Sequence, residues 1–109
     1  MPSFKIDLST AVVFVATPPV PKLVSKQTGE RAMDRETGAP LSTVGLMISD
    51  EGEANLHQVT IPETGYSEGL KPGFPVTVVG LKARDWENTF NGQTRHGISF
   101  RATAITAMV

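Results

Sequence analysis

Prolines and glycines fall between runs of β-branched residues along this chain, and the pattern requires no helix. Eight prolines and ten glycines separate runs rich in valine, threonine and isoleucine. Proline cannot donate to a β-ladder and glycine favours turns, so this spacing is typical of short strands joined by turns. The 109 residues include no cysteine, so an apolar core without disulfides must stabilise the fold. We therefore predict one all-β domain over residues 1–109.

The apolar pattern divides the chain into five strands, predicted at residues 10–17, 41–48, 54–61, 74–87 and 95–108. The first is apolar on both faces, and the prolines at 18, 19 and 21 should end it. Alternation places Val44, Leu46 and Ile48 on one face of the second strand, and His57, Val59 and Ile61 on one face of the third. Residues 22–40, with turns at Thr28-Gly29 and Thr37-Gly38, form a long arm between the first two strands. Residues 62–72 leave room for one helical turn at most.

Asn91-Gly92 is the strongest turn signal in the chain, because a type I′ hairpin turn requires a positive φ at both central residues. If these two residues form the turn, Phe90 lies opposite Gln93 and the rest of the register follows. One face of the hairpin then carries three apolar pairs: Ala83 with Phe100, Leu81 with Ala102, and Val79 with Ala104. This face should belong to the core.

The other face of the same hairpin is basic and aromatic. It pairs Lys82 with Arg101, Arg84 with Ser99, Trp86 with Gly97, and Asn88 with Arg95. Like charges directly opposite each other destabilise a ladder unless an anion lies between them, and a phosphate would serve. Trp86 faces a glycine, so no opposing side chain covers its ring, and a nucleobase could stack there. The alternative is a solvated face, with Trp86 packed under the arm.

Phe90, at the tip of the hairpin, is a second aromatic candidate for base stacking, and its alternative role is a contact with a neighbouring subunit. Cations and open aromatic rings on one β surface are what a sequence-tolerant single-strand binder requires. The net charge of −1 gives no overall attraction to nucleic acid, but the charges are segregated. Residues 36–70 contain six acidic residues and no lysine or arginine, whereas both flanking segments are net positive.

Residues 73–87, 91–95 and 98–105 resemble the last hairpin of bacterial single-stranded DNA-binding proteins. The shared order is a glycine turn, an alternating valine strand, a glycine, two basic residues, a tryptophan, a polar Asn-Gly loop, an arginine and a closing strand. Residues 12–15 and 37–48 show a looser likeness, so that about two-thirds of the chain is covered. The resemblance implies a five-stranded Greek-key barrel of the oligonucleotide-binding (OB) type, with the long arm between strands one and two.

The resemblance also implies roles for individual residues. Trp86 would stack on bases, while Lys82, Arg84, Arg95 and Arg101 hold the phosphate backbone. In the arm, Lys22, Lys26, Arg31 and Arg35 would close over the bound strand. The expected partner is single-stranded DNA, with RNA as an alternative, and the expected assembly is a homodimer or tetramer.

The chain departs from that family at two points. The family's helix between strands three and four has no counterpart in residues 62–72, and the chain stops without an acidic tail. The short connector is similar to that of the compact single-strand binders of filamentous phages. We therefore expect an accessory protein of a plasmid, phage or integrated element.

The two other classes of function are a protein-interaction module and an enzyme. An OB-type protein-interaction module is the main rival, because Val78 and Ile105 would form an exposed apolar spot unless a bulge at Gly80 turns them inward. An enzyme is not favoured, since the sequence has two histidines and no recognisable catalytic motif, metal site or cofactor site. No apolar run approaches the ~20 residues that span a bilayer, so we expect a cytoplasmic protein without membrane contact.

Overall fold

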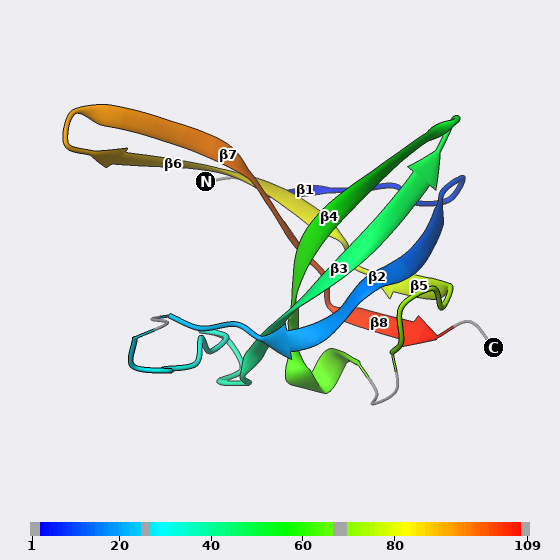
Figure 1. Cartoon of the computed structure of the whole chain (residues 1–109), viewed down its shortest axis with the longest axis horizontal. Helices are drawn as coiled ribbons and strands as arrows, with labels where there is room; N and C mark the ends of the chain where they lie inside the picture. Colours follow the sequence, from blue (N-terminus) through cyan, green and yellow to red (C-terminus); the bar gives the residue numbers. More distant parts are fainter. Residues whose placement is uncertain (1–2, 25–26, 67–69, 108–109) are drawn as a thin grey trace.

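The computed structural model describes residues 3–24, 27–66 and 70–107, and in these ranges it is all-β (Figure 1). The side chains of Asn88 and Phe90 are not described. In chain order the elements are β1 (Ser3–Lys5), β2 (Val12–Pro21), β3 (Leu41–Asp50), β4 (Glu53–Pro62), the 3-10 turn η1 (Glu63–Gly65), β5 (Val76–Val79), β6 (Lys82–Phe90), β7 (Gln93–Arg101) and β8 (Ala104–Ala107). No helix in the described part of the chain is long and apolar enough to cross a membrane.

Six strands form one mixed sheet in the order β1-β6-β7-β4-β3-β2, and β5 pairs with β8 in a second, two-stranded sheet. Neighbouring strands are antiparallel except β4 and β7, which are parallel. The chain just before β5 returns to β2. There the Val15 N–H donates to the Phe74 carbonyl at 2.9 Å, and the Gly73 N–H donates to the Val15 carbonyl at 2.7 Å. The curled sheet thus brings its last strand against the start of the smaller sheet.

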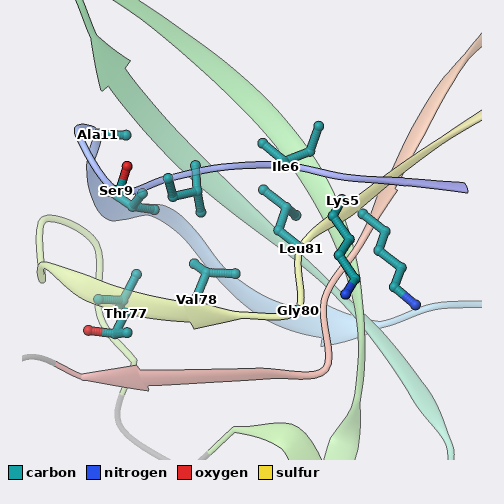
Figure 2. Close-up of a pocket in the computed structure, with 12 residues that line it drawn as sticks. Lys5, Ile6, Ser9, Ala11, Thr77, Val78, Gly80 and Leu81 are labelled. Carbon is teal, nitrogen blue, oxygen red and sulfur yellow. The ribbon is translucent and has the colours of Figure 1, made fainter.

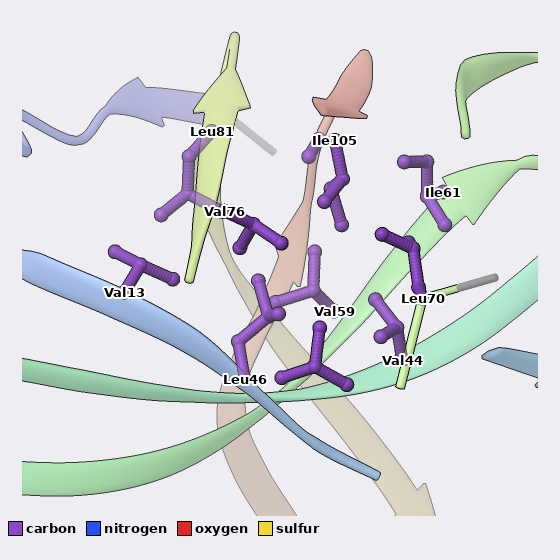
Figure 3. Packing of buried hydrophobic residues seen from close by; sticks show 11 residues of the cluster. Val13, Val44, Leu46, Val59, Ile61, Leu70, Val76, Leu81 and Ile105 are labelled. Atoms are coloured by element: carbon purple, nitrogen blue, oxygen red, sulfur yellow. The ribbon is translucent and has the colours of Figure 1, made fainter. Parts of the chain in front are cut away.

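The core lies between the two sheets (Figure 3). Alternation along β3 and β4 directs Val44, Leu46, Val59 and Ile61 inward, and each is fully buried, as the sequence predicts. Burying one aliphatic side chain of this size contributes about 1.5–3 kcal/mol, so each of these positions stabilises the sheet. The remaining members of the buried cluster are Val13, Val15, Leu70, Val76, Leu81, Ala102 and Ile105.

The prediction that prolines end the first strand is wrong, because β2 continues through Pro18 and Pro19 to Pro21. β2 is the last strand of the six-stranded sheet, and its register with β3 shifts between Val15 and Thr17 and again between Thr17 and Val20. Prolines are tolerated at edges and irregularities, where no ladder N–H is required. The prolines therefore lie in an irregular part of the strand without ending it.

The last two predicted strands are each broken in two. Gly80, with φ at +69°, separates β5 from β6, and the Thr103 N–H holds the corner by donating to the Val79 carbonyl at 2.9 Å. The break reverses the inward face: Ile105 is buried and Val78 packs against the core, whereas Val79 is 50% exposed. The predicted apolar pairing of Val79 with Ala104 exists but does not belong to the core. Gly80 thus turns Val78 and Ile105 inward and removes the expected apolar spot.

Strand β1 is an element that the sequence pattern did not predict. It is only three residues long and pairs antiparallel with β6, placing Phe4 opposite Ala83 and Lys5 opposite Lys82. In the described part of residues 62–72, η1 is the one short turn that the sequence allows. The arm is folded through isolated bridges between Leu23 and Arg31 and between Met33 and Pro40.

Candidate nucleic-acid interface

The β6–β7 hairpin has the predicted register throughout. Asn91 and Gly92 have φ values of +51° and +76°, as a type I′ turn requires. From that turn the ladder runs from Phe90 opposite Gln93 down to Lys82 opposite Arg101. Figure 1 shows the hairpin extending well beyond the rest of the molecule. Both of its faces are therefore largely open to solvent near the tip.

The two faces of this hairpin carry opposite charge. The basic face contains Lys82, Arg84, Arg95 and Arg101, together with Trp86, and all five side chains are exposed. The opposite, acidic face carries Asp85 and Glu87 on β6 and His96 and Ile98 on β7. Because side chains alternate along a strand, the sequence order basic-x-basic-acidic-aromatic-acidic produces this separation directly.

Trp86 lies across the ladder from Gly97, and its indole ring occupies the space that a side chain at 97 would fill. A Cβ atom built on Gly97 would lie 2.7 Å from Cζ2 and 2.9 Å from Cε2 of the ring. Trp86 nevertheless remains 42% exposed, which argues against the alternative that the arm covers it. The ring is thus supported by backbone and still accessible for stacking.

Strand β1 adds Lys5 to the basic face, a residue that the sequence analysis did not single out. Lys5, Lys82 and Arg101 are successive partners across β1, β6 and β7, and Arg101 is next to Thr60 on β4. The Lys22 ammonium group reaches the same place and donates to the Thr60 hydroxyl at 3.1 Å. These cations form a row that crosses four strands, which we call the basic row: Lys5, Lys82, Arg101 and Lys22.

Arg101 has a partner within the chain itself. The Asp34 carboxylate, on the arm, forms an ion pair with it at 2.8 Å, and Asp34 is only 6% exposed. Asp34 also accepts hydrogen bonds from the Glu36 N–H at 3.2 Å and the Thr37 hydroxyl at 3.0 Å. The Arg101 hydrogen bond is the largest cause that lowers the pKa of Asp34 below its ordinary value. The protein thus supplies an anion for Arg101 itself.

The other predicted arm residues differ in their surroundings. Arg31 pairs with Glu63 at 3.2 Å and donates to the Ser42 hydroxyl at 3.0 Å, so it ties the arm to β3 and η1. Ser42 is fully buried and shares a hydrogen bond of 2.8 Å with the Tyr66 hydroxyl. Arg35 is exposed. Lys26 and the Phe90 side chain, both predicted to contact nucleic acid, lie outside the described residues.

A groove of about 590 Å³ lies between the segment that follows β1 and strand β5 (Figure 2). Figure 2 shows Lys5 at the end of this groove that is remote from Ser9 and Thr77. The lining is mostly aliphatic and includes Ile6, Val78 and Leu81. Its lining suits apolar contact beside two lysines, Lys5 and Lys82.

Comparison with known proteins found no matching family model, no matching curated protein and no matching solved structure. The candidate interface therefore rests on geometry. The fold brings together Lys82, Arg84, Trp86, Arg95 and Arg101 on one face, adds Lys22 and Lys5 at its base, and uses Arg31 to hold the arm.

Proposed function

We propose that this chain binds single-stranded nucleic acid through the basic face of the β6–β7 hairpin and the adjoining basic row, without catalysing a reaction. The observation that carries the proposal is the division of charge across one exposed hairpin. Four cations and an open tryptophan share one face, while both acidic residues of the hairpin lie on the other. A phosphate backbone requires the cations, and every base offers a π-face to the indole ring.

The strand order supports an OB-type barrel as the scaffold. Without the short β1, strands β2, β3 and β4 can be counted as strands one to three of a barrel, β5 with β6 as strand four, and β7 with β8 as strand five. The order in the large sheet is then 1-2-3-5-4. Strand four then returns to strand one through the bridge between Phe14 and Pro75. The parallel pairing of β4 with β7 is the three-to-five contact of such a Greek-key barrel. The arm lies between its first two strands.

In this proposal Trp86 stacks on a base, while Lys82, Arg84, Arg95 and Arg101 contact phosphates. Lys22 and Lys5 extend the cationic surface toward the arm and the β1 edge. The resemblance to single-stranded DNA-binding proteins favours DNA as the ligand, although RNA presents the same phosphates and base faces. The same resemblance supports a homodimer or tetramer and an accessory role in a plasmid, phage or integrated element.

The test is a titration with an oligothymidylate that is followed by Trp86 fluorescence and by anisotropy of the labelled oligonucleotide. Arg84→Glu should weaken binding by about tenfold or more, equivalent to about 1.4 kcal/mol. Lys71→Glu makes the same change in net charge at an exposed lysine outside the interface and should leave affinity nearly unchanged. Affinity should also fall steeply between about 50 mM and 200 mM salt. Equal effects of the two substitutions, or no binding at low salt, would refute the proposal.

A second candidate function is protein assembly through the acidic face of the hairpin. Phe4 and Ile98, which lie on that face, are 61% and 63% exposed. Large apolar side chains that remain uncovered beside acidic residues suit a protein partner better than a phosphate backbone. Ile98→Lys would abolish such an assembly and leave nucleic-acid affinity intact, so sedimentation and binding measurements on this variant separate the two functions.

A further inference from the structure

The arm is attached to the proposed binding surface at the centre of the basic row. Arg101 lies between Lys82 on β6 and Thr60 on β4. The Lys22 ammonium group donates a hydrogen bond to the Thr60 hydroxyl. The arm contacts Arg101 through the carboxylate of Asp34. The Asp34–Arg101 ion pair at 2.8 Å is one of two ion pairs found among the described residues, and the other involves Arg31.

The chemistry of this contact is that of a phosphate contact. Asp34 Oδ1 lies 2.8 Å from Arg101 Nη2, and an anionic phosphate oxygen is the same kind of acceptor for that nitrogen. Asp34 therefore occupies the acceptor position on Arg101 that the proposed function assigns to the nucleic-acid backbone. A phosphate oxygen cannot occupy the position of Asp34 Oδ1 on Nη2 at the same time as the carboxylate.

We propose that Asp34 competes with the nucleic-acid backbone for Arg101, so that the turn of the arm that carries Asp34 holds Arg101 in the free protein and is displaced from it by a bound strand. This inference rests on the proposed nucleic-acid binding. The turn that carries Asp34 can leave Arg101 while Arg31 keeps its contacts with Glu63 and Ser42, because the other acceptor contacts of the Asp34 carboxylate are local. The Glu36 N–H and the Thr37 hydroxyl lie on the same turn of the arm and stay with it.

The competition has a measurable consequence for affinity. A ligand that must displace an internal group binds more weakly than it would bind to the open form. Removing the internal group should therefore raise the affinity to that of the open form. It also has a consequence for salt dependence. When Arg101 already holds an internal anion, binding at this residue releases fewer counterions. The salt slope is the fall of log affinity with log salt concentration, and each phosphate contact with a single strand contributes about 0.7 to it.

The decisive comparison is between Asp34→Asn and Glu36→Gln. Each substitution removes one negative charge from the same turn, but only Asp34 contacts Arg101. Asp34→Asn should bind oligothymidylate at least about fivefold more tightly than the wild type, the lower end of ordinary coupling between sites. Its salt slope should be steeper by about 0.7. Glu36→Gln should leave the slope unchanged.

The outcomes separate this inference from the proposed function. If the wild type binds but Asp34→Asn binds equally or more weakly, or if Glu36→Gln matches its gain, the competition is refuted and the proposed function stands. If no variant binds at low salt, the proposed function itself fails.

A second measurement uses the wild-type chain and does not depend on how a variant folds. The carboxyl carbon signal of Asp34 and the guanidinium signal of Arg101 can be followed by NMR during titration with oligothymidylate at neutral pH. Both signals should shift as phosphate replaces the carboxylate, while the carboxyl signal of Glu36 stays in place. An Asp34 signal that is unchanged at saturation would show that the ion pair persists in the complex and would overturn the inference.

Discussion

The indole ring of Trp86 rests on Gly97 of the neighbouring strand, where a Cβ atom would come within 2.7 Å of the ring. This contact both supports the indole ring and leaves it exposed. The absence of a side chain at 97 gives the ring a flat backbone seat, and the 42% exposure of Trp86 leaves part of the ring accessible to a ligand. Substitutions at either residue should therefore affect binding more than folding.

Gly97→Ala should displace the indole ring and weaken binding. The new methyl group must push away ring atoms of an exposed side chain, which can rotate, so the free energy of unfolding should change little. Trp86 emission in the free protein should change, and affinity for oligothymidylate should fall. Thr94→Ala, on the opposite face of the same strand, serves as the control and should change neither quantity. Unchanged emission and affinity in Gly97→Ala would contradict the role given to this contact.

Trp86→Ala should reduce affinity by the loss of one stacked base. Such a truncation typically removes about 1–3 kcal/mol of binding free energy per base. Trp86→Phe retains a π-face and should recover most of the loss. Because both variants lack the tryptophan signal, anisotropy of a labelled oligonucleotide provides the measurement. Equal affinities for the alanine and phenylalanine variants would show that stacking at this position contributes nothing.

Gly80→Ala should destabilise the fold more than Gly29→Ala does. Both glycines have a positive φ, at +69° and +71°, so both substitutions carry backbone strain of about 1 kcal/mol or more. Only at Gly80 would the added Cβ also approach Thr103 Oγ1, at 2.6 Å, whereas Gly29 faces open space. Urea unfolding of the two variants measures the difference. Equal losses would mean that the β5–β6 corner tolerates the side chain.

Acid should weaken the attachment of the arm. The pKa of Asp34 is lower in the folded protein than its ordinary value, chiefly because of the Arg101 hydrogen bond. A lowered pKa means that this stabilisation is present above the unfolded pKa of about 3.9 and is lost as pH falls through the folded pKa. Urea unfolding at pH 7 and pH 3 should therefore show a smaller loss of stability for Asp34→Asn than for the wild type.

Two comparisons check the origin of that pH dependence. Asp7 also has a lowered pKa, because the Ser9 N–H donates to its carboxylate, so Asp34→Asn should retain part of the acid sensitivity. Arg101→Gln removes the partner instead of the acid and should reduce the loss between pH 7 and pH 3 as well. If both variants lose as much stability between pH 7 and pH 3 as the wild type, the acid sensitivity comes from other groups.

Local patterns in the sequence were sufficient to predict the hairpin and the inner faces of β3 and β4. Asn91-Gly92 determines the register of the whole β6–β7 ladder, because the turn requires two positive φ values that few other residue pairs tolerate. Alternation determines which side chains of β3 and β4 point inward, because a strand has a period of two. The basic face follows from these two rules alone.

The tertiary structure decided what distant segments do to one another. The reversal of faces at Gly80 depends on a corner held by Thr103, and the three residues of β1 become a strand only because the edge of β6 is available. The Asp34–Arg101 ion pair joins the arm to the last hairpin, and no local pattern relates those positions. Turn geometry and side-chain alternation are encoded within a few residues, whereas the pairing of remote groups depends on how the whole sheet curls and closes.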